Sequence, residues 1–83
     1  MGRLTGKAAI ITGAGSGIGW AAARRFADEG ARVVCADISG REREIAGLLG
    51  EVALPVSVDV TKSADVQRMV ATAVESFGRL DIL

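Results

Sequence analysis

The sequence contains no histidine and no tyrosine, and only one cysteine among its 83 residues. Protein zinc sites are built largely from histidine and cysteine, so a site of that kind is not expected and we assign no metal ligand. A single cysteine cannot form an intrachain disulfide, which fits a reducing, cytoplasmic location. Cys35 lies in an apolar run and is expected to be a buried, unreactive thiol.

Net charge is also absent, because ten Lys and Arg residues balance ten Asp and Glu residues. This balance disfavours nucleic acid or an anionic membrane surface as the main partner. No apolar run reaches the roughly 18 residues of a membrane-spanning helix, and the first residues do not follow the pattern of a signal peptide. The length predicts a single domain, residues 1–83, in which any anion site arises from local geometry.

Glycine is abundant by contrast, and four of the eleven glycines lie within residues 13–19. An apolar run over residues 7–12 precedes them, and a run with helical spacing over residues 18–29 follows, which predicts a strand, a tight turn and a helix. Glycine lets a ligand approach closely, and a helix start supplies free N–H donors and partial positive charge. The stretch therefore predicts a phosphate or pyrophosphate site.

The spacing of these glycines excludes two common phosphate-binding patterns. Neither Gly13 nor Gly15 begins a G-x-G-x-x-G run, and no glycine is followed by the Lys-Ser/Thr pair of a P-loop. The pattern that fits is T-G-x-x-x-G-x-G, over residues 12–19. This leaves a glycine-rich turn of a different kind at the end of the first strand.

Strands and helices alternate along the rest of the chain. Apolar and β-branched runs predict strands over residues 32–37, 52–59 and 80–83. Two runs with helical spacing separate them, a short one ended by Gly50 and a longer one closed by Gly78. The order β-α-β-α-β-α-β predicts an α/β fold: a partial, Rossmann-like, doubly wound parallel sheet with strand order 3-2-1-4.

Particular side chains refine this expectation. Pro55 places the third strand at the sheet edge, because proline cannot donate to a strand ladder. Ser39 and Glu42 have the spacing of a capping box for the short helix, and Thr61 or Ser63 is expected to cap the long helix. The residues of these two helices expected to face inward are Ile45, Leu48, Leu49, Val66, Met69, Val70, Ala73, Val74 and Phe77.

Four motifs in this order resemble the amino-terminal part of the classical short-chain dehydrogenase/reductase family: residues 12–19, 36–37, 58–60 and 77–83. The resemblance implies an NAD(P)-dependent oxidoreductase that moves hydride between a nicotinamide ring and a carbonyl or alcohol carbon of a small-molecule substrate. In the family an Asn-Asn-Ala-Gly segment follows the fourth strand, and the catalytic Ser and Tyr-x-x-x-Lys pair come later. No catalytic residue is therefore expected here, and the chain alone is expected to be an inactive part of a homo-oligomeric parent.

Five residues of the glycine-rich turn are predicted to bind the cofactor. Gly13 allows the chain to turn out of the strand. Gly17 and Gly19 let the pyrophosphate and the strand approach the helix. Ser16 and Ile18 offer backbone or hydroxyl donors.

The ends of the second and third strands supply the remaining predicted cofactor contacts. Asp37 is expected to accept hydrogen bonds from the adenosine ribose and to repel a 2′-phosphate, which favours NAD over NADP, although Arg41 lies near enough to weaken this preference. Asp59 is expected to accept from the adenine amine, Val60 N–H to bond a ring nitrogen, and Ile38 to line the adenine pocket. Local turn or capping roles are the alternative for both carboxylates.

Two other functions remain open from the sequence. One is a stand-alone nucleotide-binding module without catalysis, and the other is an interaction protein that uses the half-fold for dimerisation. A reading frame that continues past Leu83 into Asn-Asn-Ala-Gly favours the dehydrogenase, whereas a stop codon there favours the module. The substrate cannot be read from these residues.

Overall fold

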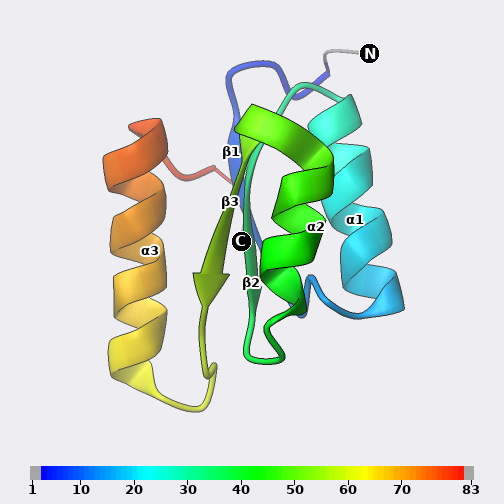
Figure 1. The fold of residues 1–83 in the computed structure, drawn as a ribbon. Coiled ribbons are helices and arrows are strands. Elements are labelled where there is room, and N and C mark those ends of the chain that lie inside the picture. The colour runs from blue at the N-terminus through cyan, green and yellow to red at the C-terminus, as the bar shows by residue number, and fades with distance from the viewer. Residues whose placement is uncertain (1–2, 82–83) are drawn as a thin grey trace.

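Strands and helices alternate along residues 3–81, the part of the chain that the computed structural model describes (Figure 1). Each strand is followed by a helix, as the spacing of apolar residues predicted. No helix within these residues is both long and apolar enough to cross a membrane. The strands are β1 (Ala8–Thr12), β2 (Arg32–Asp37) and β3 (Ala53–Ser57), and the helices are α1 (Gly17–Asp28), α2 (Arg41–Leu49), the short 3₁₀ helix η1 (Gly50–Val52) and α3 (Ser63–Phe77).

The three strands form a parallel sheet in the order β1-β2-β3. In its register, Cys35 of the central strand lies between Ile11 of β1 and Pro55 of β3. The predicted order 3-2-1 is thus confirmed, and so is the place of the proline-containing strand at the edge. Pro55 is exposed on this edge strand, a position that tolerates a residue without an N–H donor.

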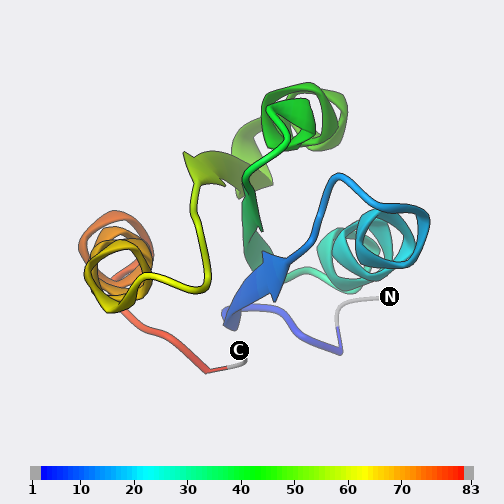
Figure 2. The same ribbon diagram turned by 90° about the horizontal axis from the view of Figure 1, so that it is seen from below.

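Helices cover both faces of the sheet, with α1 and α2 on one side and α3 on the other (Figures 1 and 2). Successive side chains of β2 point to opposite faces of the sheet. Val34 and Ala36 pack toward α3, whereas Val33 and Cys35 pack toward α1 and α2. Both faces of the strand are apolar because both are covered. The helices complete the two cores with Met69 and Ala73 from α3, Ala23 from α1, and Ile45 and Ala46 from α2.

Only Leu80 and Asp81 of the predicted fourth strand lie within the described residues, where neither is assigned to a strand; Ile82 and Leu83 lie outside them. Asp81 follows α3 and lies beside the free edge of β1, where its N–H donates to the Ala8 carbonyl (2.9 Å) and its Oδ2 accepts the Ala8 N–H (3.0 Å). Arg79 holds the same carboxylate through two hydrogen bonds of 2.6 and 2.7 Å, and these bonds, with that from Ala8, keep the pKa of Asp81 low. This is the side of β1 on which the order 3-2-1-4 places the strand.

Two residues expected to face inward are exposed. Leu48 lies outside the buried arc of α2, which is centred on Ile45 and Ala46, and its side chain is 67% exposed. Val74 lies at the margin of the α3 stripe formed around Met69 and is 45% exposed. Both predictions were wrong because the helices bury a narrower arc than the spacing of apolar residues covers.

The helix caps also differ from the prediction. Gly40, in the left-handed conformation, and not Ser39 is the residue that precedes α2. The Glu42 side chain accepts the Gly40 N–H (2.9 Å), and Ser39 Oγ accepts the Arg41 N–H (3.2 Å). Neither Thr61 nor Ser63 caps α3, which follows Lys62 without a side-chain cap. The Thr61 hydroxyl is used elsewhere in the loop before α3, so it is not available to the helix.

Cys35 is completely buried in the middle of β2, and burial raises the pKa of its thiol to about 11. Because the thiolate is the reactive form, we expect the folded chain at about pH 8 to react with a thiol reagent at least about 100-fold more slowly than the chain unfolded in guanidinium. The release of coloured thiolate from a disulfide reagent measures both rates. Rapid reaction of the folded chain would contradict the burial of this residue.

Candidate functional site

The loops that follow β1, β2 and β3 meet at the carboxyl-terminal edge of the sheet, the lower edge in Figure 1 and the near side in Figure 2. Backbone hydrogen bonds join them: the Ala14 N–H donates to the Ala36 carbonyl (3.1 Å), and the Val58 N–H donates to the Asp37 carbonyl (2.9 Å). Ligands of open α/β sheets bind at this edge. All nine residues predicted to contact a cofactor lie on it: Gly13, Ser16, Gly17, Ile18, Gly19, Asp37, Ile38, Asp59 and Val60.

The turn after β1 is closed by Gly13 and Ser16. Gly13 has a φ of 68°, a left-handed conformation that favours glycine. Its carbonyl accepts both the N–H (2.9 Å) and the hydroxyl (2.8 Å) of Ser16, and the same hydroxyl oxygen accepts the Gly19 N–H (3.2 Å) as the N-cap of α1. Ser16 therefore uses its own donors to shape the turn.

The first two N–H groups of α1 remain available. Within residues 3–81, neither Gly17 nor Ile18 donates its N–H to another residue, whereas the next N–H, that of Gly19, is capped by Ser16. A helix start of this kind carries partial positive charge along with its free donors. The arrangement suits an anion placed against the first turn of α1.

Gly19 and Gly17 differ in what surrounds them. A Cβ added to Gly19 would overlap the Gly13 carbonyl, so glycine here allows α1 to pack against the turn. A Cβ added to Gly17 would meet no atom within 4 Å. Protein packing therefore does not require a glycine at position 17, and the open space beside it is where a ligand can approach the backbone.

The Asp37 carboxylate lies between the first two loops. Its Oδ2 accepts the Gly15 N–H (2.7 Å), and its Oδ1 accepts the N–H groups of Ile38 (2.7 Å) and Ser39 (3.4 Å). Partial burial opposes ionisation, but these hydrogen bonds outweigh it and lower the pKa of Asp37. The group is charged at neutral pH. Gly15 was not among the predicted site residues. The T-G-x-x-x-G-x-G pattern does not require a glycine at this position, and its presence was the one signal that could have indicated a role.

Asp59 makes the local contacts that were the alternative to a ligand contact. Its Oδ1 accepts both the N–H (3.0 Å) and the hydroxyl (2.6 Å) of Thr61, which lower the pKa of Asp59, and its own N–H donates to Asp65 Oδ2 (3.0 Å). These bonds fix the loop between β3 and α3. The contact between Asp59 and adenine stays a prediction.

Exposed apolar side chains accompany these polar groups. Ile18, Ile38 and Val60 are 88%, 65% and 60% exposed, and each belongs to a different one of the three loop regions. They are three of the six large hydrophobic side chains that are exposed within residues 3–81. Single exposed apolar residues are common, but three at the edge that also carries the free N–H groups provide apolar surface for a ring system.

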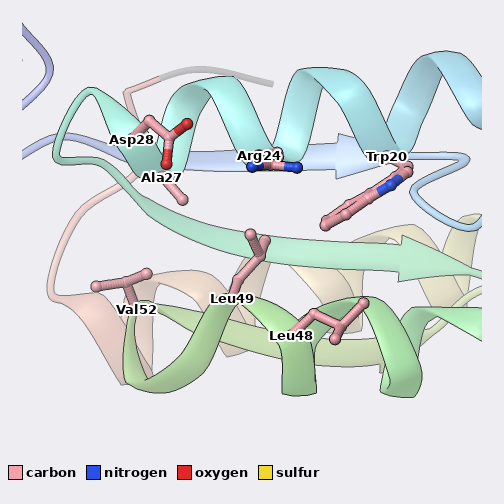
Figure 3. A pocket seen from close by; sticks show the side chains of 7 residues that line it. All are labelled: Trp20, Arg24, Ala27, Asp28, Leu48, Leu49 and Val52. Carbon is pink, nitrogen blue, oxygen red and sulfur yellow. The ribbon is translucent and has the colours of Figure 1, made fainter.

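A groove of about 550 Å³ lies elsewhere, between α1 and α2 (Figure 3). None of the nine predicted residues lines it, so it is separate from the loop edge. Trp20 lies in this groove and is partly exposed. The groove is lined by Trp20, Arg24, Ala27, Asp28, Leu48, Leu49 and Val52.

A doubly wound parallel sheet with a glycine-rich turn and free N–H groups after its first strand is typical of the first half of a Rossmann-like nucleotide-binding domain. Within that class, the chain belongs to the short-chain dehydrogenase family, whose sequence model matches residues 7–83. The resemblance deduced from the four motifs is therefore confirmed.

Curated and solved relatives agree with this assignment. The mitochondrial borneol dehydrogenase of Lavandula x intermedia is 51% identical over 82 residues, which cover 98% of this chain and 31% of the relative. A 3-ketoacyl-(acyl-carrier-protein) reductase from Brucella melitensis, solved with NADH, is 45% identical with a TM-score of 0.93, covering 96% of this chain and 34% of that one. A short-chain dehydrogenase/reductase from Burkholderia phymatum, solved with NAD, is 37% identical with a TM-score of 0.91, covering 99% and 31%. The chain thus spans about a third of each relative.

Proposed function

We propose that these residues form the cofactor-binding part of an NAD-dependent oxidoreductase that transfers hydride to or from a carbonyl or alcohol carbon. The observation that carries the proposal is the pair of free N–H groups at Gly17 and Ile18, next to open space. Those groups suit a pyrophosphate, and membership of the short-chain dehydrogenase family makes a nicotinamide dinucleotide the best candidate.

The rest of the dinucleotide would then lie along the loop edge toward β3. The ribose hydroxyls of its adenosine donate to the Asp37 carboxylate, which keeps acceptor capacity beyond its backbone bonds. The adenine ring lies against the exposed side chains of Ile38 and Val60, with its amine toward Asp59 and a ring nitrogen on the Val60 N–H. This path crosses from β1 through β2 to β3, the order of the strands in the sheet.

NAD is proposed over NADP because Asp37 is ionised at neutral pH and would repel a 2′-phosphate. Two similar structures were solved with NADH and with NAD, which supports a nicotinamide cofactor. Arg41 lies beside the same turn and could attract the 2′-phosphate that Asp37 repels. The preference for NAD therefore depends on the balance between these two opposing charges.

The substrate and the reacting groups are proposed to come from residues that this chain does not contain. The family's tyrosine acid/base has no counterpart here, since the sequence contains no tyrosine. We propose that these residues hold the cofactor in a longer parent protein. That protein is proposed to be cytoplasmic, to assemble as a homo-oligomer and to act on a small molecule.

Cofactor titration by isothermal calorimetry tests the proposal. The chain is expected to bind NAD more tightly than NADP, and Asp37→Ala is expected to reduce this preference at least about tenfold, or about 1.4 kcal/mol. Asp37→Asn separates charge from hydrogen bonding, because it keeps an acceptor without the charge. Asp28→Ala, the same change at the far end of α1, is the control and should leave the preference intact.

Two results would contradict the proposal in different parts. If the unsubstituted 83-residue chain bound neither dinucleotide at millimolar concentration, a cofactor-binding function would be wrong. If it bound NAD but Asp37→Ala kept the full preference, the contact between Asp37 and the ribose would be wrong while the pyrophosphate site remained.

A further inference from the structure

Gly15 is a glycine for a reason of space and not of backbone conformation. Its φ lies outside the left-handed region, so other residues could adopt its backbone geometry. A Cβ there would lie 2.5 Å from Asp37 Oδ2, 2.9 Å from Ser39 Oγ and 2.9 Å from Arg41 Cβ. All three distances are well below an ordinary contact, so any side chain at this position must displace the carboxylate of Asp37, the hydroxyl of Ser39 and the Cβ of Arg41.

The same residue donates its N–H to Asp37 Oδ2 at 2.7 Å. The loop after β2 is thus docked on the loop after β1 through a residue without a side chain. Asp37 and Arg41, which bear opposite charges and which the proposed function places near the 2′ position of the ribose, both lie against this residue. Their positions relative to a bound adenosine depend on how closely they approach Gly15.

We propose that Gly15 is a positioning residue that sets the preference for NAD over NADP, because its lack of a side chain lets Asp37 lie across the glycine-rich turn and face the ribose. The inference rests on the proposed function and deepens it. Gly15 acts through Asp37 and touches no reacting atom. Its contribution differs from that of Gly17, whose open side faces the pyrophosphate that NAD and NADP share.

A methyl group at position 15 must push the carboxylate away by about 1 Å to reach an ordinary contact distance of about 3.5 Å. The Gly15–Asp37 hydrogen bond is then stretched, and the carboxylate no longer faces the ribose hydroxyls squarely. NAD loses its acceptor, whereas NADP is relieved of a repelling charge. The two affinities therefore converge.

Gly15→Ala, measured by calorimetric titration with NAD and with NADP, tests this inference. We expect the dissociation constant for NADP divided by that for NAD to fall at least about fivefold. Gly47→Ala, in α2 where a Cβ meets nothing within 4 Å, is the matched control and should keep the parent ratio. Circular dichroism establishes that each variant is folded before its titration.

A double-mutant cycle separates positioning from a general structural effect. In an Asp37→Ala background, Gly15→Ala has no carboxylate to displace, so it should leave the ratio unchanged. An equal fall in the ratio in both backgrounds would overturn the inference. If Gly15→Ala lowers the folded content, the pair Gly15→Ala with Ser39→Gly removes one overlap and keeps the displacement of Asp37, and the same ratio is measured there.

The outcomes distinguish this inference from the proposed function. If the parent chain prefers NAD and folded Gly15→Ala keeps that preference in full, Gly15 does not set it, and the cofactor site stands. If the parent chain binds neither dinucleotide, both the cofactor site and this inference fall.

Discussion

Gly19→Ala is expected to destabilise the chain severely, so that it unfolds at a much lower urea concentration than the unsubstituted chain. The added Cβ would overlap the Gly13 carbonyl oxygen and lie 2.6 Å from the Gly13 carbonyl carbon and 3.0 Å from Ala14 Cα. All three are backbone atoms, so no change of side-chain rotamer can relieve the overlap. Overpacking of mobile side chains already destabilises proteins by about 1–3 kcal/mol, and we expect at least about 3 kcal/mol here. A chain of 83 residues has a free energy of unfolding of only about 4–12 kcal/mol.

Gly47→Ala provides the comparison, because both substitutions replace a helical glycine with alanine. No atom lies within 4 Å of a Cβ at Gly47, so the gain in helix propensity should stabilise the chain by about 0.5–1 kcal/mol. Urea unfolding followed by circular dichroism measures both changes. Should Gly19→Ala unfold at the same urea concentration as the parent, α1 does not pack against the turn as closely as described.

The order of the elements was predictable because it depends on properties that the sequence shows directly. The change from strand to helical spacing located β1 and α1, and Pro55 independently indicated the edge strand. The positions of Leu48 and Thr61 were not predictable in the same way. The first depends on how far α2 is rotated against the sheet, and the second on a hydroxyl that can bond either to a helix start or to Asp59.

The site was predictable to the level of its loops. The nine predicted residues lie on one edge of the sheet because they follow parallel strands, whose carboxyl ends are all at the same edge. The contact between Gly15 and Asp37 was missed, since the two residues are 22 apart in the chain and the glycine pattern leaves position 15 free. Sequence spacing identifies which segments meet, whereas the choice of partner within a loop depends on distances of a few tenths of an ångström.

Gly17→Val is expected to abolish most cofactor binding while the chain stays folded. Gly17 is the first residue of α1, its φ is not left-handed, and a Cβ there meets no atom within 4 Å. We therefore expect the free energy of unfolding to change by less than about 1 kcal/mol. The valine side chain would instead occupy the open space through which a pyrophosphate reaches the N–H groups of Gly17 and Ile18. Charge-assisted hydrogen bonds contribute about 1.5–3 kcal/mol each, so loss of the two should lower the affinity at least about 100-fold.

The loss should be equal for NAD and NADP, because the two share the pyrophosphate, and this separates Gly17→Val from substitutions at Asp37 and Gly15. Gly47→Val is the matched control, since it puts the same side chain into open space on a helix away from the loop edge. Titrations with NADH and with NADPH, each followed by energy transfer from Trp20, the only tryptophan, measure both losses in both variants. An unchanged titration of folded Gly17→Val would mean that the pyrophosphate does not lie on the first turn of α1. The adenosine contacts at β2 and β3 would then lack the anchor that places them, because each was positioned from that turn.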